Sequence, residues 1–222
     1  HLGGSLLVAD GSRDYPVTGR FWRLLQDHKV SYVGVAPTLI RGLMRHGNED
    51  VERYDLSSLR VTCSGGEAWT EAPWRWFFEH VCKTKLPFLN IVGGTEVGGC
   101  NFTGTLHHPL RPGSFGARGL GAGVNIVNES GQPVGPGQVG ELVLRNPNIG
   151  FTKSLWRDGE RYLDSYWRTL PGLWVHGDFA MRDADGLFYI LGRSADTLKV
   201  SGTRTGPSET ETLLTGPGTV AE

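Results

Sequence analysis

The amino-acid sequence predicts an α/β fold followed by a β-rich part. In about the first hundred residues, apolar positions spaced as on a helix face alternate with short apolar runs typical of buried strands. After about Gly104 the helical spacing disappears, and short β-rich segments follow at roughly even intervals. The chain has 222 residues, 38% of them hydrophobic, so it is long enough to bury a substantial core.

In the first part, predicted helices and strands alternate. Phe21, Leu25 and His28 recur at i, i+4 and i+7, which predicts an amphipathic helix. Thr70 is a favourable N-cap for a second helix that carries its aromatic residues on one face. The predicted elements are, in order, a helix over 17–29, a strand over 31–35, a helix over 38–45, a strand over 59–63, the helix after Thr70, and a strand over 88–92. Strands separated by helices in this way favour a parallel sheet.

The second part predicts a compact β-rich subdomain, either a small barrel or a sheet. Its predicted strands cover 124–128, 141–145, 173–176 and 187–191. Turn signals such as Asp185-Gly186 separate them. We therefore divide the chain into an α/β part over residues 1–104, a β-rich part over 105–191 and a last part over 192–222.

Charge and composition exclude several classes of protein. The chain has 22 Lys and Arg against 23 Asp and Glu, and this balance argues against a nucleic-acid partner and a polybasic membrane anchor. No stretch approaches the roughly 20 apolar residues of a membrane span. Three cysteines without a CxxC pattern argue against a disulfide framework and favour a cytoplasmic location. The chain starts at His1 without a signal-peptide pattern, which favours a piece of a longer protein.

Two glycine-rich loops follow predicted strands, over 63–68 and 92–99. In open α/β sheets ligands bind beyond the carboxyl ends of the strands, so both loops lie where a small molecule would bind. Thr95 offers a hydroxyl, and Glu96 offers an oxygen ligand suited to Mg²⁺ held together with phosphates. The alternative is that the glycines only form turns and that Glu96 is a solvated loop residue.

A third segment, over 174–193, carries polar groups suited to a nucleotide. Asp178 can accept hydrogen bonds from two sugar hydroxyls, and Arg193 and Arg204 can each bind phosphate or carboxylate oxygens. The alternative is a plain hairpin in which Asp185-Gly186 is the turn and Asp178 caps a loop.

These segments together resemble the adenylate-forming superfamily, which includes acyl- and aryl-CoA synthetases. The stretches NIVGGTEVGG, GDFAMRDADGLFYILGR and KVSGTRTGPSE occur in the order and at about the spacing of that superfamily. GFTKSLWRDGERYLDSYW and LPGLWVHGDFA resemble acetyl-CoA synthetase and its near relatives in particular. The resemblance implies the end of a large N-terminal α/β domain with its β-rich subdomain, and it implies that residues 192–222 are a hinge and the start of a C-terminal domain.

The resemblance also implies roles for individual residues. It implies that the adenine contacts Gly66, Glu67, Ala68, Asn90, Ile91, Val92 and Gly94. For the sugar and phosphates it implies a ribose contact at Asp178, ribose and phosphate contacts at Arg193, an α-phosphate contact at Thr95 and a triphosphate contact at Arg204. It also implies a magnesium ligand at Glu96 and a CoA contact at Ser201. Thr95, Glu96 and Arg204 would be catalytic. Val35, Gly65 and Gly93 would line the acyl pocket, and glycine at position 93, where acetyl-CoA synthetases carry tryptophan, implies an acid longer than acetate. The alternative is that a side chain from outside these residues fills the space.

The function implied is an ATP-dependent acyl-CoA synthetase. Such an enzyme uses Mg²⁺, activates a carboxylate as acyl-AMP and transfers the acyl group to CoA. The phosphate loop and the C-terminal lysine of the superfamily do not occur in these 222 residues, so we expect the 222 residues to be inactive alone. At the hinge, Ala195 stands where the superfamily has an aspartate, and Asp196 follows it. Two alternatives remain open: a non-catalytic nucleotide-binding or regulatory module, and an aromatic-rich domain that binds carbohydrate or protein.

Overall fold

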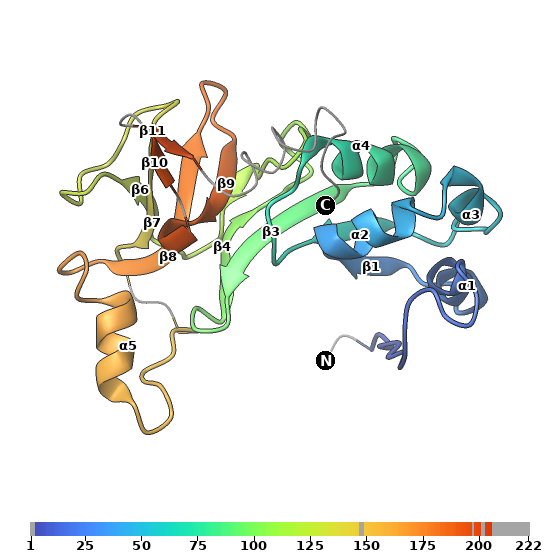
Figure 1. Cartoon of the computed structure of the whole chain (residues 1–222), viewed down its shortest axis with the longest axis horizontal. Coiled ribbons are helices and arrows are strands. Elements are labelled where there is room, and N and C mark those ends of the chain that lie inside the picture. Colours follow the sequence, from blue (N-terminus) through green and yellow to red (C-terminus); the bar gives the residue numbers. More distant parts are fainter. Residues whose placement is uncertain (1–2, 147–148, 197, 201–202, 206–222) are drawn as a thin grey trace.

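The computed structural model contains two larger β-sheets and a short β-hairpin (Figure 1). It describes residues 3–146, 149–196, 198–200 and 203–205. The first sheet has the strand order β1-β2-β3-β4-β5, and the second has the order β6-β7-β8-β9. The structure therefore confirms an α/β part followed by a β-rich part.

The first sheet is mixed rather than purely parallel. Its strands are β1 (Tyr32–Val35), β2 (Val61–Ser64), β3 (Phe88–Gly94), β4 (Gly99–Thr103) and β5 (Ala117–Arg118). β1, β2 and β3 pair in parallel, whereas β4 and β5 add in antiparallel fashion. β3 runs two residues further than expected because Gly93 and Gly94 still pair with β4. β5 belongs to this sheet although it follows Gly104, the predicted end of the α/β part. The division of the chain into three parts stays a prediction.

Four helices accompany the first sheet. They are α1 (Arg20–Asp27), α2 (Pro37–Met44), α3 (Asn48–Glu52) and α4 (Glu71–His80). Trp22, Ile40 and Phe77 are fully buried in a common core with Phe88 of β3. Thr70 precedes α4 as predicted, but its side chain makes no capping hydrogen bond. The short α3 was not predicted, because five residues are too few to show a helical period.

The second sheet is an open antiparallel sheet. Its strands are β6 (Val124–Val127), β7 (Val139–Leu144), β8 (Trp174–Arg182) and β9 (Phe188–Arg193). Its pairings run from β6 to β9 without a pairing between these two outer strands in the described residues, so the structure has the sheet and not the barrel. Leu142, Leu144 and Trp174 form a second core together with Phe102 of the first sheet.

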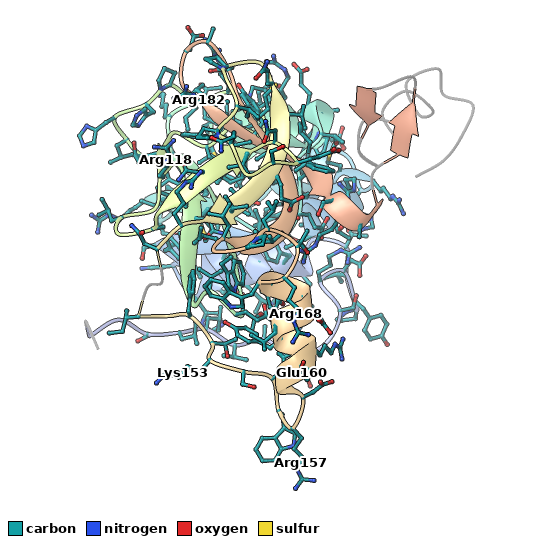
Figure 2. All side chains as sticks on the ribbon, turned by 90° about the vertical axis from the view of Figure 1, so that its left-hand side faces the viewer. Arg118, Lys153, Arg157, Glu160, Arg168 and Arg182 are labelled. Carbon is teal, nitrogen blue, oxygen red and sulfur yellow. The ribbon has the colours of Figure 1, made fainter. Side chains whose placement is uncertain are left out.

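The last described elements are a helix beside the second sheet and a terminal hairpin. α5 (Gly159–Tyr166) was not predicted, and it begins at Asp158, whose carboxylate accepts a hydrogen bond from the Arg161 amide. Figure 2 shows α5 at the lower edge of the molecule, with Arg157 at the outer end of the loop that precedes it. A short 3₁₀ helix (Ser194–Asp196) leads to the hairpin of β10 (Leu198–Val200) and β11 (Thr203–Thr205). None of the helices in the described ranges is long and apolar enough to cross a membrane.

Candidate functional site

A cavity of about 400 Å³ lies where the two larger sheets meet. From the side of the first sheet it is lined by Gly66, Glu67, Ala68, Ile91, Val92 and Gly93. From the side of the second sheet it is lined by His176, Asp178, Ile190, Gly192 and Arg193. Residues from three segments that are distant in the sequence, each predicted to bind a nucleotide, therefore meet at one cavity.

The first wall is the loop after β2. Gly66 has φ +94°, a left-handed conformation that favours glycine, and this allows the chain to turn sharply at the end of the strand. The next residue, Glu67, is held by α2, because its Oε2 accepts hydrogen bonds from Thr38 Oγ1 at 2.6 Å and from Arg41 at 3.2 Å. These bonds fix the loop against α2 and leave its backbone along the cavity.

The second wall is β3 and the turn that joins it to β4. Ile91, Val92 and Gly93 line the cavity, and Thr95 begins a tight turn closed by hydrogen bonds from the Val97 and Gly98 amides to the Gly94 carbonyl, at 3.2 and 3.1 Å. The Glu96 carbonyl accepts a further hydrogen bond from the Thr152 amide at 2.7 Å. The turn is therefore fixed on both sides, with Thr95 and Glu96 beside the cavity wall rather than in it.

Glu96 also interacts with Tyr166 at the end of α5. Burial, followed by the charge of Glu96 and a hydrogen bond to it, raises the pKa of the Tyr166 hydroxyl. The hydroxyl therefore keeps its proton at neutral pH and donates to the carboxylate. The Tyr166 ring stacks on Trp174 of β8 with a centroid distance of 4.7 Å and an interplanar angle of 2°. Because Tyr166 contacts both Glu96 and Trp174, it connects Glu96 to the second sheet.

The third wall is an irregular stretch of β8. Val175 pairs with Val143 and Phe179 pairs with Glu141, so residues 176–178 form a bulge against β7. At its centre Gly177 has φ +84°, and its amide donates to Glu141 Oε1 at 3.1 Å. Bulges locally bend a strand and reorient its side chains. Here the bulge directs the two flanking residues, His176 and Asp178, into the cavity.

Asp178 lies between two cationic or potentially cationic groups. Its Oδ2 is 2.7 Å from Nδ1 of His176, and its Oδ1 is 3.6 Å from Nε of Arg193. Only 11% of its side chain is exposed. A carboxylate that is this little exposed to solvent needs polar partners. His176 and Arg193 are those partners, and the Asp178 carboxylate lies beside the cavity. Asp178 therefore lines the cavity as a carboxylate acceptor.

Several predicted site residues do not line the cavity. Asn90 is buried next to it, where its Nδ2 donates to the Ser114 carbonyl at 3.1 Å. Val35 and Gly65 are also absent from its lining. Arg204 belongs to β11, where it pairs with Lys199, and Ser201 lies outside the described residues. The roles of all five remain predictions.

Gly93 lines the cavity, but the adjacent strand β4 leaves no room for a side chain at this position. A Cβ at this position would lie 2.0 Å from the carbonyl oxygen of Gly99 on β4. Any side chain here requires a shift of backbone, so the close approach of β3 and β4 by itself explains this glycine. The expectation of an acid longer than acetate stays a prediction.

The sequence reasoning missed His176, Arg41 and Phe115. His176 is 7% exposed and lies two residues before Asp178, a spacing that places side chains on the same face of a strand. That spacing was available as a signal. Arg41 on the helix α2 and Phe115 in the loop before β5 carry no local pattern that points to a ligand, because they reach the cavity only through the tertiary fold.

Glu96 fits magnesium as a single protein ligand. Mg²⁺ usually takes one or two carboxylates together with substrate phosphates and water. Glu96 is the only acid in the turn at residues 95–98, and the described residues contain no group of three or more His, Cys, Asp or Glu side chains that could hold a metal ion. The residues present therefore suit a metal that arrives with a phosphate ligand.

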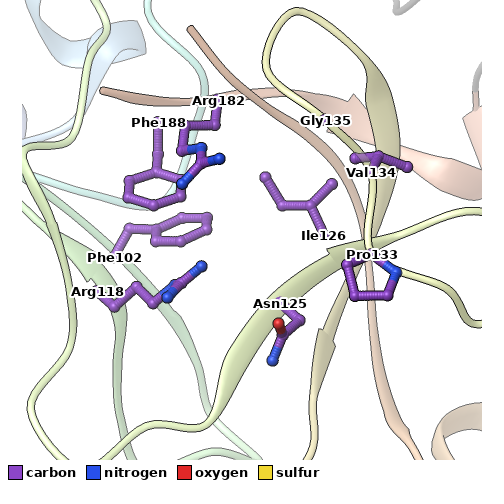
Figure 3. A pocket seen from close by; sticks show the side chains of 9 residues that line it. All are labelled: Phe102, Arg118, Asn125, Ile126, Pro133, Val134, Gly135, Arg182 and Phe188. Atoms are coloured by element: carbon purple, nitrogen blue, oxygen red, sulfur yellow. The ribbon is translucent and has the colours of Figure 1, made fainter. Parts of the chain in front are cut away.

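A second, smaller cavity of about 110 Å³ lies apart from these residues. Figure 3 shows Arg118 and Arg182 around the rings of Phe102 and Phe188, which stack at a centroid distance of 4.4 Å. The Arg118 guanidinium carbon lies 5.6 Å from the Phe188 ring centroid, a cation–π arrangement. Its lining shares no residue with the nucleotide site predicted from the sequence.

Comparison with known proteins gives concordant results. The family model described as AMP-binding enzyme matches residues 1–152. The acetyl-coenzyme A synthetase of Pyrobaculum aerophilum is 36% identical over 224 aligned residues, covering 100% of this chain and 33% of the relative. The acetyl-coenzyme A synthetase of Methanothrix soehngenii is 37% identical, covering 100% of this chain and 34% of the relative. The chain thus spans about a third of the length of these curated relatives.

Solved structures agree with this assignment. The acetoacetyl-CoA synthetase of Streptomyces lividans superimposes with a TM-score of 0.79 at 30% identity, covering 90% of this chain and 31% of that one. An anthranilate CoA ligase in complex with anthranoyl-AMP gives a TM-score of 0.81 at 27% identity, covering 96% and 39%. With a family model that matches more than half of its residues, the chain belongs to the family of AMP-binding enzymes.

Proposed function

We propose that these 222 residues form the nucleotide-binding region of an ATP-dependent acyl-CoA synthetase. The enzyme would join a carboxylate to CoA through an acyl-AMP intermediate, with a location in the cytoplasm. The observation that carries the proposal is the convergence of the Gly66 loop, the end of β3 and the Asp178–Arg193 pair on one cavity of about 400 Å³. The relatives named acetyl-CoA synthetase and the two CoA-ligase structures support the same reaction class.

The cavity suggests how this region would hold ATP. The adenine would lie between the backbone of Gly66–Ala68 and the side chains of Ile91 and Val92. The ribose hydroxyls would donate to Asp178, and Arg193 would contact the ribose and the α-phosphate. Hydrogen bonds to a charged carboxylate are stronger than those between neutral groups, so Asp178 would contribute much of the sugar affinity.

The reaction would proceed by two displacements. A carboxylate oxygen of the acid forms a bond to the α-phosphorus of ATP, and pyrophosphate leaves. The CoA sulfur then forms a bond to the acyl carbon, and AMP leaves. Thr95 and Arg193 would stabilise the charge that develops on the α-phosphate, and Mg²⁺ would neutralise part of the triphosphate charge from a ligand position at Glu96. Catalysis of this kind depends on positioning and on charge stabilisation.

Two other functions have less support. A carbohydrate- or protein-binding aromatic surface requires a group of exposed rings, but Trp22, Trp74 and Trp174 are buried in the two cores, and the exposed Trp156 lies in the loop before α5. A regulatory nucleotide-binding module would use the same cavity and would bind ATP without releasing pyrophosphate. Pyrophosphate release by the complete native protein, with CoA and a set of short carboxylic acids, separates this alternative from the synthetase.

The nucleotide site is tested by replacing Asp178 with asparagine in the complete native protein. Asp178→Asn keeps the shape and removes the charge, so we expect ATP affinity to fall about 10- to 100-fold, as for the loss of charge-assisted hydrogen bonds. Isothermal titration calorimetry measures the change. Asp164→Asn is the matched control, because Asp164 pairs with Arg168 on the exposed face of α5. Equal ATP affinity in both variants would remove Asp178 from the site.

A further inference from the structure

His176 is a buried polar side chain at the cavity to which the proposed reaction assigns no role. Only 5% of its side chain is exposed. Nδ1 lies 2.7 Å from Oδ2 of Asp178, and Nε2 lies 3.2 Å from the carbonyl oxygen of Gly93. Because Gly93 is in β3 and Asp178 is in β8, this one ring contacts both sheets across the cavity.

The contacts of the ring fix its orientation. The Gly93 carbonyl and the Asp178 carboxylate are both acceptors, so a ring that binds both must donate from Nε2 and from Nδ1. The same ring packs edge-on to Trp174 at a centroid distance of 5.9 Å, and Nε2 would lie 3.4 Å from a Cβ added at Gly94. Rotation of the imidazole is therefore restricted on the side of β3 and on the side of β8.

Nδ1 shows that the ring is not there for packing alone. It is buried and close to Oδ2 of Asp178, yet the contact lacks hydrogen-bond geometry in the described structure. A buried polar atom without a hydrogen-bond partner is unfavourable, and each one calls for an explanation, which a functional role or a bound water supplies. Nδ1 lies against the carboxylate on the side away from Arg193, which contacts the other oxygen.

We propose that His176 is a positioning residue for Asp178. Anchored on the Gly93 carbonyl through Nε2–H, the ring presents Nδ1–H to Oδ2 of Asp178 at 2.7 Å. This attraction holds the carboxylate in the direction in which it meets the 2′- and 3′-hydroxyls of a ribonucleotide. His176 also links the sugar contact on β8 to the backbone of β3, two residues before Thr95. This inference rests on the proposed function, since it concerns the same nucleotide cavity.

The test compares two nucleotides that differ only in the sugar hydroxyls. Isothermal titration calorimetry with AMP and with 2′,3′-dideoxy-AMP is carried out on the unmodified complete protein and on H176Q. We expect H176Q to lower AMP affinity about tenfold and to leave 2′,3′-dideoxy-AMP affinity unchanged, because only AMP uses the oriented carboxylate. H80Q is the matched control: His80 lies 2.9 Å from Glu52 in a similar pair that is not part of the cavity, and we expect no change for either nucleotide.

The outcomes separate this proposal from the proposed function. If the unmodified protein binds neither nucleotide, the proposed function fails and this inference fails with it. If AMP binds and H176Q weakens both nucleotides equally, or neither, only the role of His176 is overturned. Should H176Q not fold, NMR of histidine-labelled unmodified protein decides: we expect the His176 ring signals to shift with AMP and not with 2′,3′-dideoxy-AMP, and signals that shift with neither overturn the proposal.

Discussion

Gly177 determines where the two polar residues beside it point. Its φ of +84° lies in the left-handed region, which costs a residue with a Cβ roughly 1–2 kcal/mol. Space is not the constraint, since an added Cβ would meet only Arg193 Nη1 at 3.7 Å. The glycine is needed for the backbone conformation of the bulge, and through the bulge for the directions of His176 and Asp178.

Gly177→Ala should therefore lower both stability and nucleotide affinity. We expect the free energy of unfolding to fall by about 1–2 kcal/mol and AMP affinity to fall measurably, because relief of the strain would rotate the flanking side chains. Gly137→Ala is the matched control: its φ is +77° and open space surrounds its added Cβ, outside the cavity lining. Denaturant unfolding and calorimetry measure the two effects. A loss of AMP affinity as large in Gly137→Ala would contradict the local explanation.

Residue patterns in the sequence indicated Asp178 but not His176, and the reason is physical. The local pattern at Asp178 also allowed a plain hairpin, and the resemblance to the adenylate-forming superfamily implied its ribose contact, whereas a histidine within a strand is typical of a core. Its role becomes visible only when Gly93 and Asp178 are seen on opposite sides of one ring. The contact with Gly93 is not encoded in the local sequence, and the two-residue spacing to Asp178 does not by itself distinguish a site from a core.

Among the helices, α5 supports the turn that carries the proposed magnesium ligand Glu96. Tyr166, at its end, stacks on Trp174 and donates to Glu96, so the helix holds the turn between β3 and β4 in place. Tyr162 of the same helix donates to the Thr152 carbonyl at 2.7 Å, and the Thr152 amide donates to the Glu96 carbonyl. α5 thus supports both the side chain and the backbone of Glu96.

Tyr166→Phe isolates the contribution of the hydroxyl, since the ring and its stacking remain. We expect the affinity for Mg·ATP to fall about three- to tenfold, the effect of one lost hydrogen bond to a charged group, while metal-free AMP binds as before. Calorimetry with and without Mg²⁺ measures both. The control is Tyr189→Phe, whose hydroxyl also donates to a carboxylate, Asp183, at 3.2 Å. Equal losses for Mg·ATP and AMP would show that Tyr166 does not act through Glu96.

The elements that could be predicted are those with a strong local pattern. The strands β1, β2 and β6 lie close to their predicted positions, because continuous apolar runs bounded by turn residues mark buried strands. The prediction missed β4, whose sequence Gly99-Cys-Asn-Phe-Thr103 lacks such a run, and it missed α5, whose buried face consists mainly of Tyr162. Both elements are stabilised by tertiary pairing and packing rather than by their own pattern.

The two larger sheets meet beside the cavity because the second core contains residues from both of them. Phe102 of β4 stacks on Phe188 of β9, and Phe115 exchanges two backbone hydrogen bonds with Phe188, at 2.8 and 2.9 Å. These contacts join the two larger sheets beside the cavity. The sequence predicted each sheet, but the angle between the two sheets depends on such long-range contacts. The set of residues that line the cavity depends on that angle.

We propose that one cavity between the two sheets binds the nucleotide. The most direct measurement is a structure of the complete native protein with AMP bound. We expect the adenine between Gly66–Ala68 and Ile91–Val92, and both ribose hydroxyls within about 3 Å of the Asp178 carboxylate, a normal hydrogen-bond distance. AMP bound instead at the cavity lined by Arg118 and Arg182, or an empty cavity at saturating AMP, would contradict the account.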